Sequence, residues 1–151
     1  MTVEFEIKKS PAYRVAYLTW KGPWSDQKIQ GKFGQIQKWA RAHGYRTGRW
    51  IFREPANRTW EVGIEVRGAA VRGHPPIRLK TLPAGRVASS VFNPDEVEAY
   101  VIYHGLTDWL RWRKKEGKIR SVVSYREVYG GDPWKDKAVY AKTEIQFVVR
   151  P

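Results

Sequence analysis

The chain has 151 residues, no cysteine, and 28 Lys and Arg against 15 Asp and Glu, which gives a formal net charge of +13 at pH 7. This length suits one domain that buries a core without cross-links, and the lack of cysteine excludes disulfides and thiolate metal sites. No apolar run is long enough to span a membrane, and the first residues lack the apolar segment of a secretion signal. We therefore expect a soluble, cytoplasmic protein with a single domain over residues 1–151.

Basic and aromatic residues are the two unusual parts of the composition. The positive charge raises nonspecific affinity for nucleic acid, but the only dense basic cluster is "RWRKKEGKIR" at residues 111–120. That cluster is interpreted either as a solvated helix end favoured by the helix dipole or as a DNA-binding patch. Eight Trp, eight Tyr and five Phe exceed what a small core hides. Surplus rings of this kind are typical of a groove for a flat apolar ligand.

The first part of the chain predicts two strands, a helix and two more strands. Residues 3–9 and 13–22 are extended segments around the turn signal "SPA" and are predicted to form a hairpin. Ser25 and Asp26 are N-cap candidates for the helix that follows. Gly44 is a natural C-terminal stop for that helix. The remaining expectations are an apolar helix face of Ile29, Phe33, Ile36 and Ala40, and strands at residues 48–52 and 59–66 around a loop at 53–58.

The second part repeats this order. Strands are predicted at residues 77–82 and 85–92, and a helix at 93–117, with Asn93 as its N-cap and Pro94 in its first turn. Two further strands are expected at residues 121–129 and 141–149, separated by the turn-rich connector "GGDPWKDK".

The repeated order predicts an α+β fold of two pseudo-symmetric β-α-β-β-type modules, residues 1–68 and 77–151. The two helices share a spacing, with Phe33, Ile36, Trp39 and Ala40 matching Tyr103, Leu106, Trp109 and Leu110. Residues 67–76 are the expected crossover between the halves. The modules would form an antiparallel sheet with both helices on one face and a concave ligand groove on the other.

Glu127 is the candidate functional residue, because it stands in a strand that otherwise suits burial. Alternate strand residues share a face, so Tyr125, Glu127 and Tyr129 point the same way. A carboxylate held away from water between aromatic rings favours a cationic or protonated companion. The alternative is an exposed Glu127 that pairs with a Lys or Arg across strands. Glu61 and Glu144 also occupy polar positions of alternating strands, and we expect both to be solvated.

The segments "GPWSD", "TWEVGIEV", "LPAGRVA", "REVYGGDP" and "TEIQFVV" occur in an order that resembles the GyrI-like effector-binding domain. This family is related to the drug-binding domain of multidrug-sensing transcription regulators, and the resemblance covers essentially the whole chain. It implies that Glu127 is the pocket glutamate and that Tyr125 and Tyr129 are pocket walls. Trp24, Trp60 and Trp109 are further candidates for the groove; a core role is at least as well supported for each, and it is favoured for Trp109 by its helical spacing. No helix-turn-helix segment precedes the domain, which implies a stand-alone protein that does not read DNA as the regulators do.

Three functions remain open on the sequence. The first is binding of hydrophobic aromatic, often cationic, small molecules by Glu127 and the rings. The resemblance also implies a hydrolase of cyclopropane-containing genotoxic compounds, with Glu127 and Tyr125 as catalytic residues. The third is an inhibitor that interacts with gyrase or DNA. No cofactor is predicted, and His43, His74 and His104 lack the spacing of metal ligands. The oligomeric state is left open.

Overall fold

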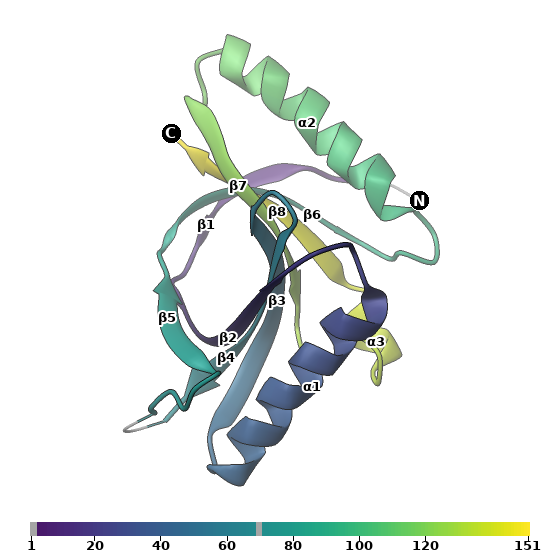
Figure 1. Ribbon diagram of the computed structural model, residues 1–151. Helices are drawn as coiled ribbons and strands as arrows, with labels where there is room; N and C mark the ends of the chain where they lie inside the picture. Colours follow the sequence, from purple (N-terminus) through teal and green to yellow (C-terminus); the bar gives the residue numbers. More distant parts are fainter. Residues whose placement is uncertain (1–2, 69–70) are drawn as a thin grey trace. The chain divides into compact units, whose positions relative to one another are not determined.

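A computed structural model describes residues 3–68 and 71–151, which form an α+β protein of antiparallel strands and three helices (Figure 1). In chain order the elements are β1 (Glu6–Ser10), β2 (Tyr13–Lys21), α1 (Asp26–Ala42), β3 (Arg46–Ala56), β4 (Thr59–Arg67), β5 (Arg78–Leu82), β6 (Gly85–Phe92), α2 (Ala99–Lys115), β7 (Ser121–Tyr129), α3 (Lys137–Tyr140) and β8 (Thr143–Arg150). No helix within the described residues is both long and apolar enough to cross a membrane.

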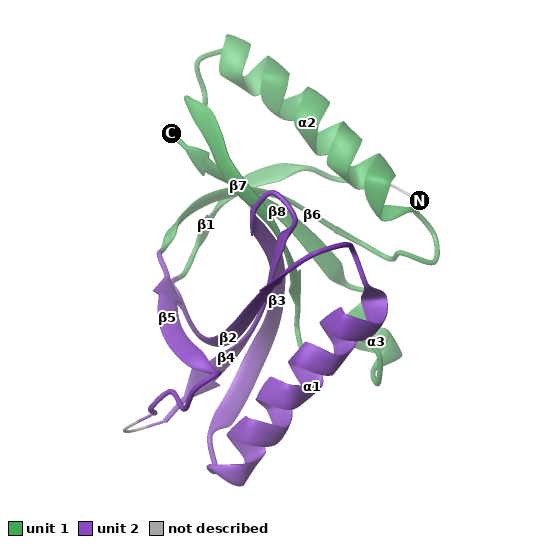
Figure 2. Cartoon of the chain, in the orientation of Figure 1, with its two compact units in different colours: residues 1–11, 84–151 green, residues 12–83 purple. Residues whose placement is uncertain are grey.

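The chain folds into two compact units (Figure 2). Unit 1 comprises residues 1–11 and 84–151, and unit 2 comprises residues 12–83. Each unit contains a four-stranded antiparallel sheet and one long helix. The pseudo-symmetric modules predicted from the repeated element order are therefore present.

Unit 2 has the strand order β3-β4-β2-β5, and α1 packs against β2, β3 and β4. Ser25 is the N-cap of α1, as predicted, since its side chain accepts a hydrogen bond from the backbone N–H of Lys28. The helix buries the predicted face, Ile29, Phe33, Ile36 and Ala40. Phe33 stacks on Trp50 of β3 at 4.8 Å between ring centroids. Gly44 follows the helix with a φ of 69°, a conformation that glycine adopts without steric cost.

Unit 1 has the strand order β1-β6-β8-β7, and α2 packs against β6 and β8. Its core is apolar and formed by helix and sheet together, with Ile102, Leu106, Leu110, Ile145 and Phe147 among its buried residues. The predicted start of the helix was wrong, because α2 begins at Ala99 with Glu98 as N-cap. Asn93 instead accepts the backbone N–H of Asp95, and this local turn satisfies its side chain before the helix begins.

The predicted hairpin between residues 3–9 and 13–22 was also wrong. β1 pairs with β6 of unit 1, whereas β2 pairs with β4 and β5 of unit 2. Unit 1 therefore combines the first strand with the last three, whereas unit 2 is one continuous stretch that ends with β5, and the compact units differ from the sequential halves 1–68 and 77–151. A short turn favours adjacent pairing, but it does not determine pairing when a longer-range partner buries more surface.

Two connections also differ from expectation. Residues 67–76 were predicted to cross between modules, yet they link β4 to β5 inside unit 2; residues 69–70 of this segment lie outside the described residues. The connector at 130–137 leads into a short helix, α3, capped by Asp136, which accepts the N–H groups of Ala138 and Val139.

Candidate functional site

Glu127 lies on the face of the unit 1 sheet that α2 covers. It stands opposite Ile145 of β8, and paired residues of antiparallel strands point to the same side. Ile145 is fully buried in the core with Ile102 and Leu106 of α2. The register therefore places this face of β7 toward α2.

Two phenols donate hydrogen bonds to the Glu127 carboxylate. The Tyr103 hydroxyl of α2 lies 2.9 Å from Oε1, and the Tyr129 hydroxyl of β7 lies 2.7 Å from Oε2. Burial, followed by the charge of Glu127 and these hydrogen bonds, raises the pKa of Tyr103 and of Tyr129 far above the usual value for a phenol. Both phenols thus remain neutral donors to a partly buried carboxylate, and no Lys or Arg among residues 3–68 and 71–151 forms an ion pair with it.

Aromatic rings extend from this carboxylate along β7 and β8. Tyr103 meets Tyr125 edge to face at 5.6 Å between centroids, and Phe147 lies 5.9 Å from Tyr103 and 6.0 Å from Tyr125. Tyr125 is 41% exposed, so this ring is accessible from solvent. We name Tyr103, Tyr125, Glu127, Tyr129 and Phe147 the tyrosine–carboxylate cluster.

The predicted tryptophans are divided between the two units. Trp24 and Trp60 belong to unit 2, where they meet edge to face at 5.3 Å and both contact Phe52. Trp109 packs on the core of unit 1 and lies 5.9 Å from Phe5. Its face is also occupied by the Arg113 guanidinium at 4.8 Å. Trp109 therefore has the core role that its helical spacing allowed.

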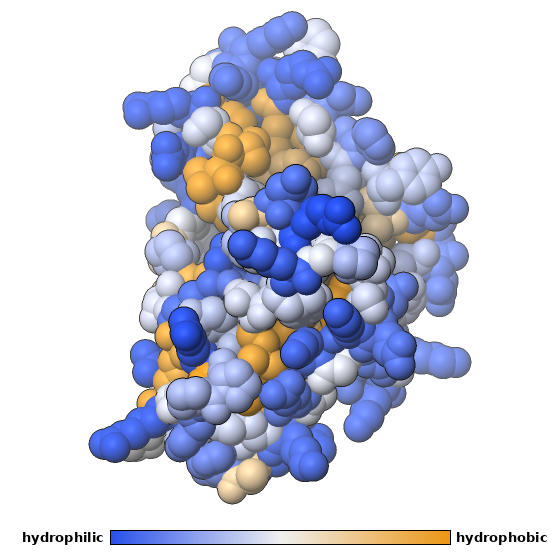
Figure 3. Space-filling model, in the orientation of Figure 1, coloured by the Kyte–Doolittle hydropathy of each residue, from blue (hydrophilic) through white to orange (hydrophobic). Residues whose placement is uncertain are grey.

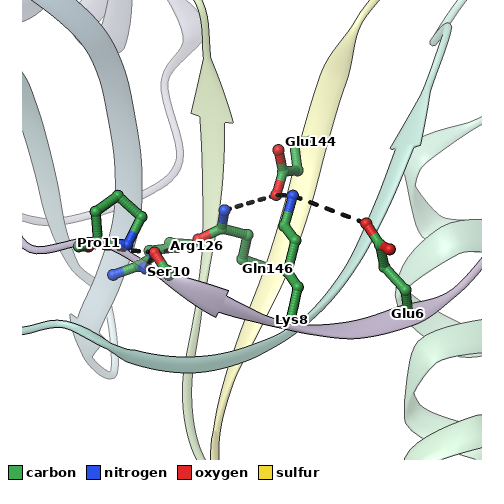
Figure 4. Close-up of polar contacts among 7 residues, drawn as sticks. All are labelled: Glu6, Lys8, Ser10, Pro11, Arg126, Glu144 and Gln146. Atoms are coloured by element: carbon green, nitrogen blue, oxygen red, sulfur yellow. Dashed lines mark hydrogen bonds and ion pairs between the residues drawn. The ribbon is translucent and has the colours of Figure 1, made fainter.

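The other face of the unit 1 sheet carries a polar network (Figure 4). Arg126, only 6% exposed, donates to Gln146 Oε1 at 2.7 Å and to Ser10 Oγ at 3.2 Å. Gln146 donates in turn to Glu144 at 2.6 Å, and Lys8 forms an ion pair with Glu144 at 3.0 Å. The Glu144 side chain is 17% exposed, so the expectation that it is solvated was wrong.

Glu61 of unit 2 is likewise buried, at 3% exposure, which contradicts the expectation of a solvated residue. Arg53 and Lys80 both pair with its carboxylate, and the Lys80 ammonium also lies 4.1 Å from the centre of the Tyr17 ring. Alternation could not distinguish these glutamates from solvated ones, because both faces of the strands are buried along much of their length.

Sequence reasoning missed Tyr103 and Phe147 as members of the cluster. The signal for Tyr103 was the helical spacing that places it one turn before Leu106 and two turns before Leu110 on the buried face of α2. No group of three His, Cys, Asp or Glu in the described part of the chain is arranged to hold a metal ion.

Comparison with known proteins identifies a family and several solved structures with a similar fold. The sequence model of the GyrI-like small molecule binding domain matches residues 3–150. No curated protein sequence matches the chain.

Three solved structures share the fold at low sequence identity. The crystal structure of the EcmrR C-terminal domain superimposes with a TM-score of 0.72 at 18% identity, over 99% of both chains. The structure of SAV2435 bound to tetraphenylphosphonium gives 0.55 at 11% identity, over 97% of this chain and 94% of that one. A hydrolase encoded by lin2189 from Listeria innocua gives 0.57 at 14% identity, over 97% of this chain and 91% of that one.

Proposed function

The chain belongs to the GyrI-like family of small-molecule binding domains, and we propose that it binds hydrophobic aromatic compounds, cationic ones included, at the tyrosine–carboxylate cluster. The observation that carries the proposal is the Glu127 carboxylate held by two phenols beside the exposed ring of Tyr125. A flat ligand would stack on Tyr125, and a positive group on it would approach the carboxylate and the faces of the neighbouring rings.

The donors around Glu127 support a role in binding. Within the described part of the chain no Lys or Arg forms an ion pair with the Glu127 carboxylate, and its oxygens, which accept the phenol hydrogen bonds, retain lone pairs for a further donor. Glu61 and Glu144 are different, because Lys or Arg side chains already pair with them. Of these three glutamates, Glu127 is therefore the one best suited to a cationic guest.

The test is equilibrium binding of tetraphenylphosphonium, the ligand of the SAV2435 structure, to the purified chain. Glu127→Gln keeps the shape of the side chain and removes its charge, so we expect the affinity to fall about tenfold, because a partly desolvated ion pair contributes roughly 1–2 kcal/mol. Glu96→Gln, at an exposed position before α2, makes the same change in net charge and is the control. Equal affinity of Glu127→Gln and the unaltered chain would overturn the proposal.

Hydrolysis of cyclopropane-containing compounds is the second candidate, favoured by phenol hydroxyls within hydrogen-bonding distance of a carboxylate. Incubation with a cyclopropane-containing alkylating agent separates the two functions. Product formation that is lost in Glu127→Gln supports the hydrolase, and saturable binding without product supports the binding protein.

A further inference from the structure

An apolar cleft opens between the C-terminal half of α2 and the start of β7. Its volume is about 440 Å³, within the usual range for small-molecule sites of roughly 300–1,000 Å³. The lining residues are Thr107, Leu110, Arg111, Lys114, Ile119, Ser121, Val122 and Phe147. In the space-filling view, hydrophobic surface gathers beside this end of α2 and is bordered by hydrophilic side chains (Figure 3).

A β-bulge explains why apolar side chains are exposed here. The pairing of β7 with β8 shifts register between Val122 and Ser124. Val122 and Val123 are consequently 45% and 51% exposed, although they stand in a strand next to the core. Bulges re-aim side chains and are frequent beside functional sites.

Of the six cations in the basic cluster at residues 111–120, three lie over aromatic rings or pair with Glu116. Arg113 lies over the Trp109 ring and pairs with Glu116 at 3.1 Å, Lys115 lies over Trp112, and Lys118 pairs with Glu116 at 3.2 Å. These cations are already engaged by groups of the same helix end.

The two cations that line the cleft are much less engaged. Arg111 pairs with Asp108 at 3.5 Å, and both side chains are about two-thirds exposed, so this pair is weak. Within residues 3–68 and 71–151, no carboxylate lies within ion-pair distance of Lys114. Arg111 and Lys114 are three residues apart and therefore share one side of the helix. Two of the cluster's weakly compensated charges thus stand at the rim of its apolar cleft.

We propose that this cleft binds an anionic amphiphile: a small molecule with an apolar ring or chain and a single carboxylate or sulfonate. The apolar part would cover Leu110, Val122 and Phe147, and the anionic group would lie between Arg111 and Lys114 at the rim. The high positive charge of the chain agrees with this class, since it raises the local concentration of anions. The site lies next to the tyrosine–carboxylate cluster, with which it shares only Phe147, and it takes ligands of the opposite charge.

The test uses 8-anilinonaphthalene-1-sulfonate as the fluorescent probe and dodecanoate as the competitor. Arg111→Glu/Lys114→Glu should lower the affinity for the probe at least about tenfold, because two favourable charge interactions become repulsive. Lys28→Glu/Lys38→Glu, at exposed positions of α1, changes the net charge equally and should change the affinity less than about twofold. Val122→Asp, which places a negative charge in the lining, should also weaken binding.

Circular dichroism of each variant excludes unfolding, since this probe also binds partly unfolded chains. An equal loss of affinity in both double variants would overturn the proposal, because only the overall charge would then matter. Failure of dodecanoate to compete would overturn it as well. Neither result bears on tetraphenylphosphonium binding at Glu127, so the two proposals can fail independently.

Discussion

Neighbouring residues of β7 have opposite charges and opposite environments. Glu127 points toward α2 and receives two phenol hydrogen bonds, whereas Arg126 points to the other face and donates to Gln146 and Ser10. Each charge is thus stabilised by neutral polar groups on its own side of the sheet. A slip of β7 by one residue would turn each charge to the face that carries the other's partners, so these contacts favour one register.

The raised pKa of Tyr103 and Tyr129 makes stability depend on alkaline pH. The unfolded chain releases each phenol proton near pH 10, while the folded chain retains it, so the free energy of unfolding is undiminished below about pH 10 and falls as the pH rises further. Each tyrosine contributes a slope of about 1.4 kcal/mol per pH unit. Tyr103→Phe should therefore reduce the slope by about that amount. Urea unfolding between pH 9.5 and 11, roughly the range in which a free phenol ionises, measures this slope.

The same variant provides its own control. Between about pH 7 and 9, free phenols are protonated in both states, so the pH dependence of Tyr103→Phe and of the unaltered chain should agree. An unchanged slope above pH 10 in both Tyr103→Phe and Tyr129→Phe would show that the phenols near Glu127 ionise like free ones.

The two long helices begin differently, although their modules correspond. Ser25 caps α1 through a side-chain hydrogen bond to Lys28 N, whereas Glu98 at the start of α2 makes no side-chain cap bond. The backbone of Glu98 is already extended, at φ −68° and ψ 142°, as an N-cap requires. Its side chain is one methylene longer than the residues that usually fill this position.

Glu98→Asp should therefore stabilise the protein. The shorter carboxylate can accept an N–H of the first turn while keeping its favourable charge at the helix N-terminus, which is expected to add about 0.5–1 kcal/mol to the free energy of unfolding. Urea unfolding at neutral pH measures the change. Glu96→Asp, in the turn before the helix, is the matched control and should be neutral. If both variants have the stability of the unaltered chain, the first turn of α2 gains nothing from a cap.

The sequence predicts these elements far better than their pairing. Apolar spacing located both long helices, and the buried face of α1 follows it residue by residue. Strand pairing was harder to predict, because β1 pairs with β6 and β5 pairs with β2, and both pairs join segments that are far apart in the chain. The candidate site was likewise predicted only in part. Alternation grouped Tyr125, Glu127 and Tyr129, but the hydroxyl of Tyr103 reaches Glu127 from a helix more than twenty residues earlier, which no local pattern encodes.

At the scale of the whole molecule, net charge is the dominant property. A formal charge of +13 attracts any polyanion, and duplex DNA gains from release of its counterions whatever its sequence. DNA binding through charges distributed over the chain and DNA binding through residues 111–120 predict different effects of substitutions on affinity. Since half of the cations in that cluster are engaged by Trp109, Trp112 and Glu116, we expect the distributed charge to dominate.

DNA binding should consequently be weak, independent of sequence and strongly dependent on salt. We expect the logarithm of the binding constant for a random duplex to fall linearly with the logarithm of the salt concentration, with a slope of about −0.9 for each phosphate contacted. Fluorescence anisotropy of a labelled duplex, over a series of salt concentrations, measures this slope. Arg111→Glu/Lys114→Glu and Lys28→Glu/Lys38→Glu should weaken binding to a similar extent, because they remove the same charge from different helices. A loss confined to the first variant would instead identify the end of α2 as a DNA-binding patch, and the cleft beside it would then compete with DNA for Arg111 and Lys114.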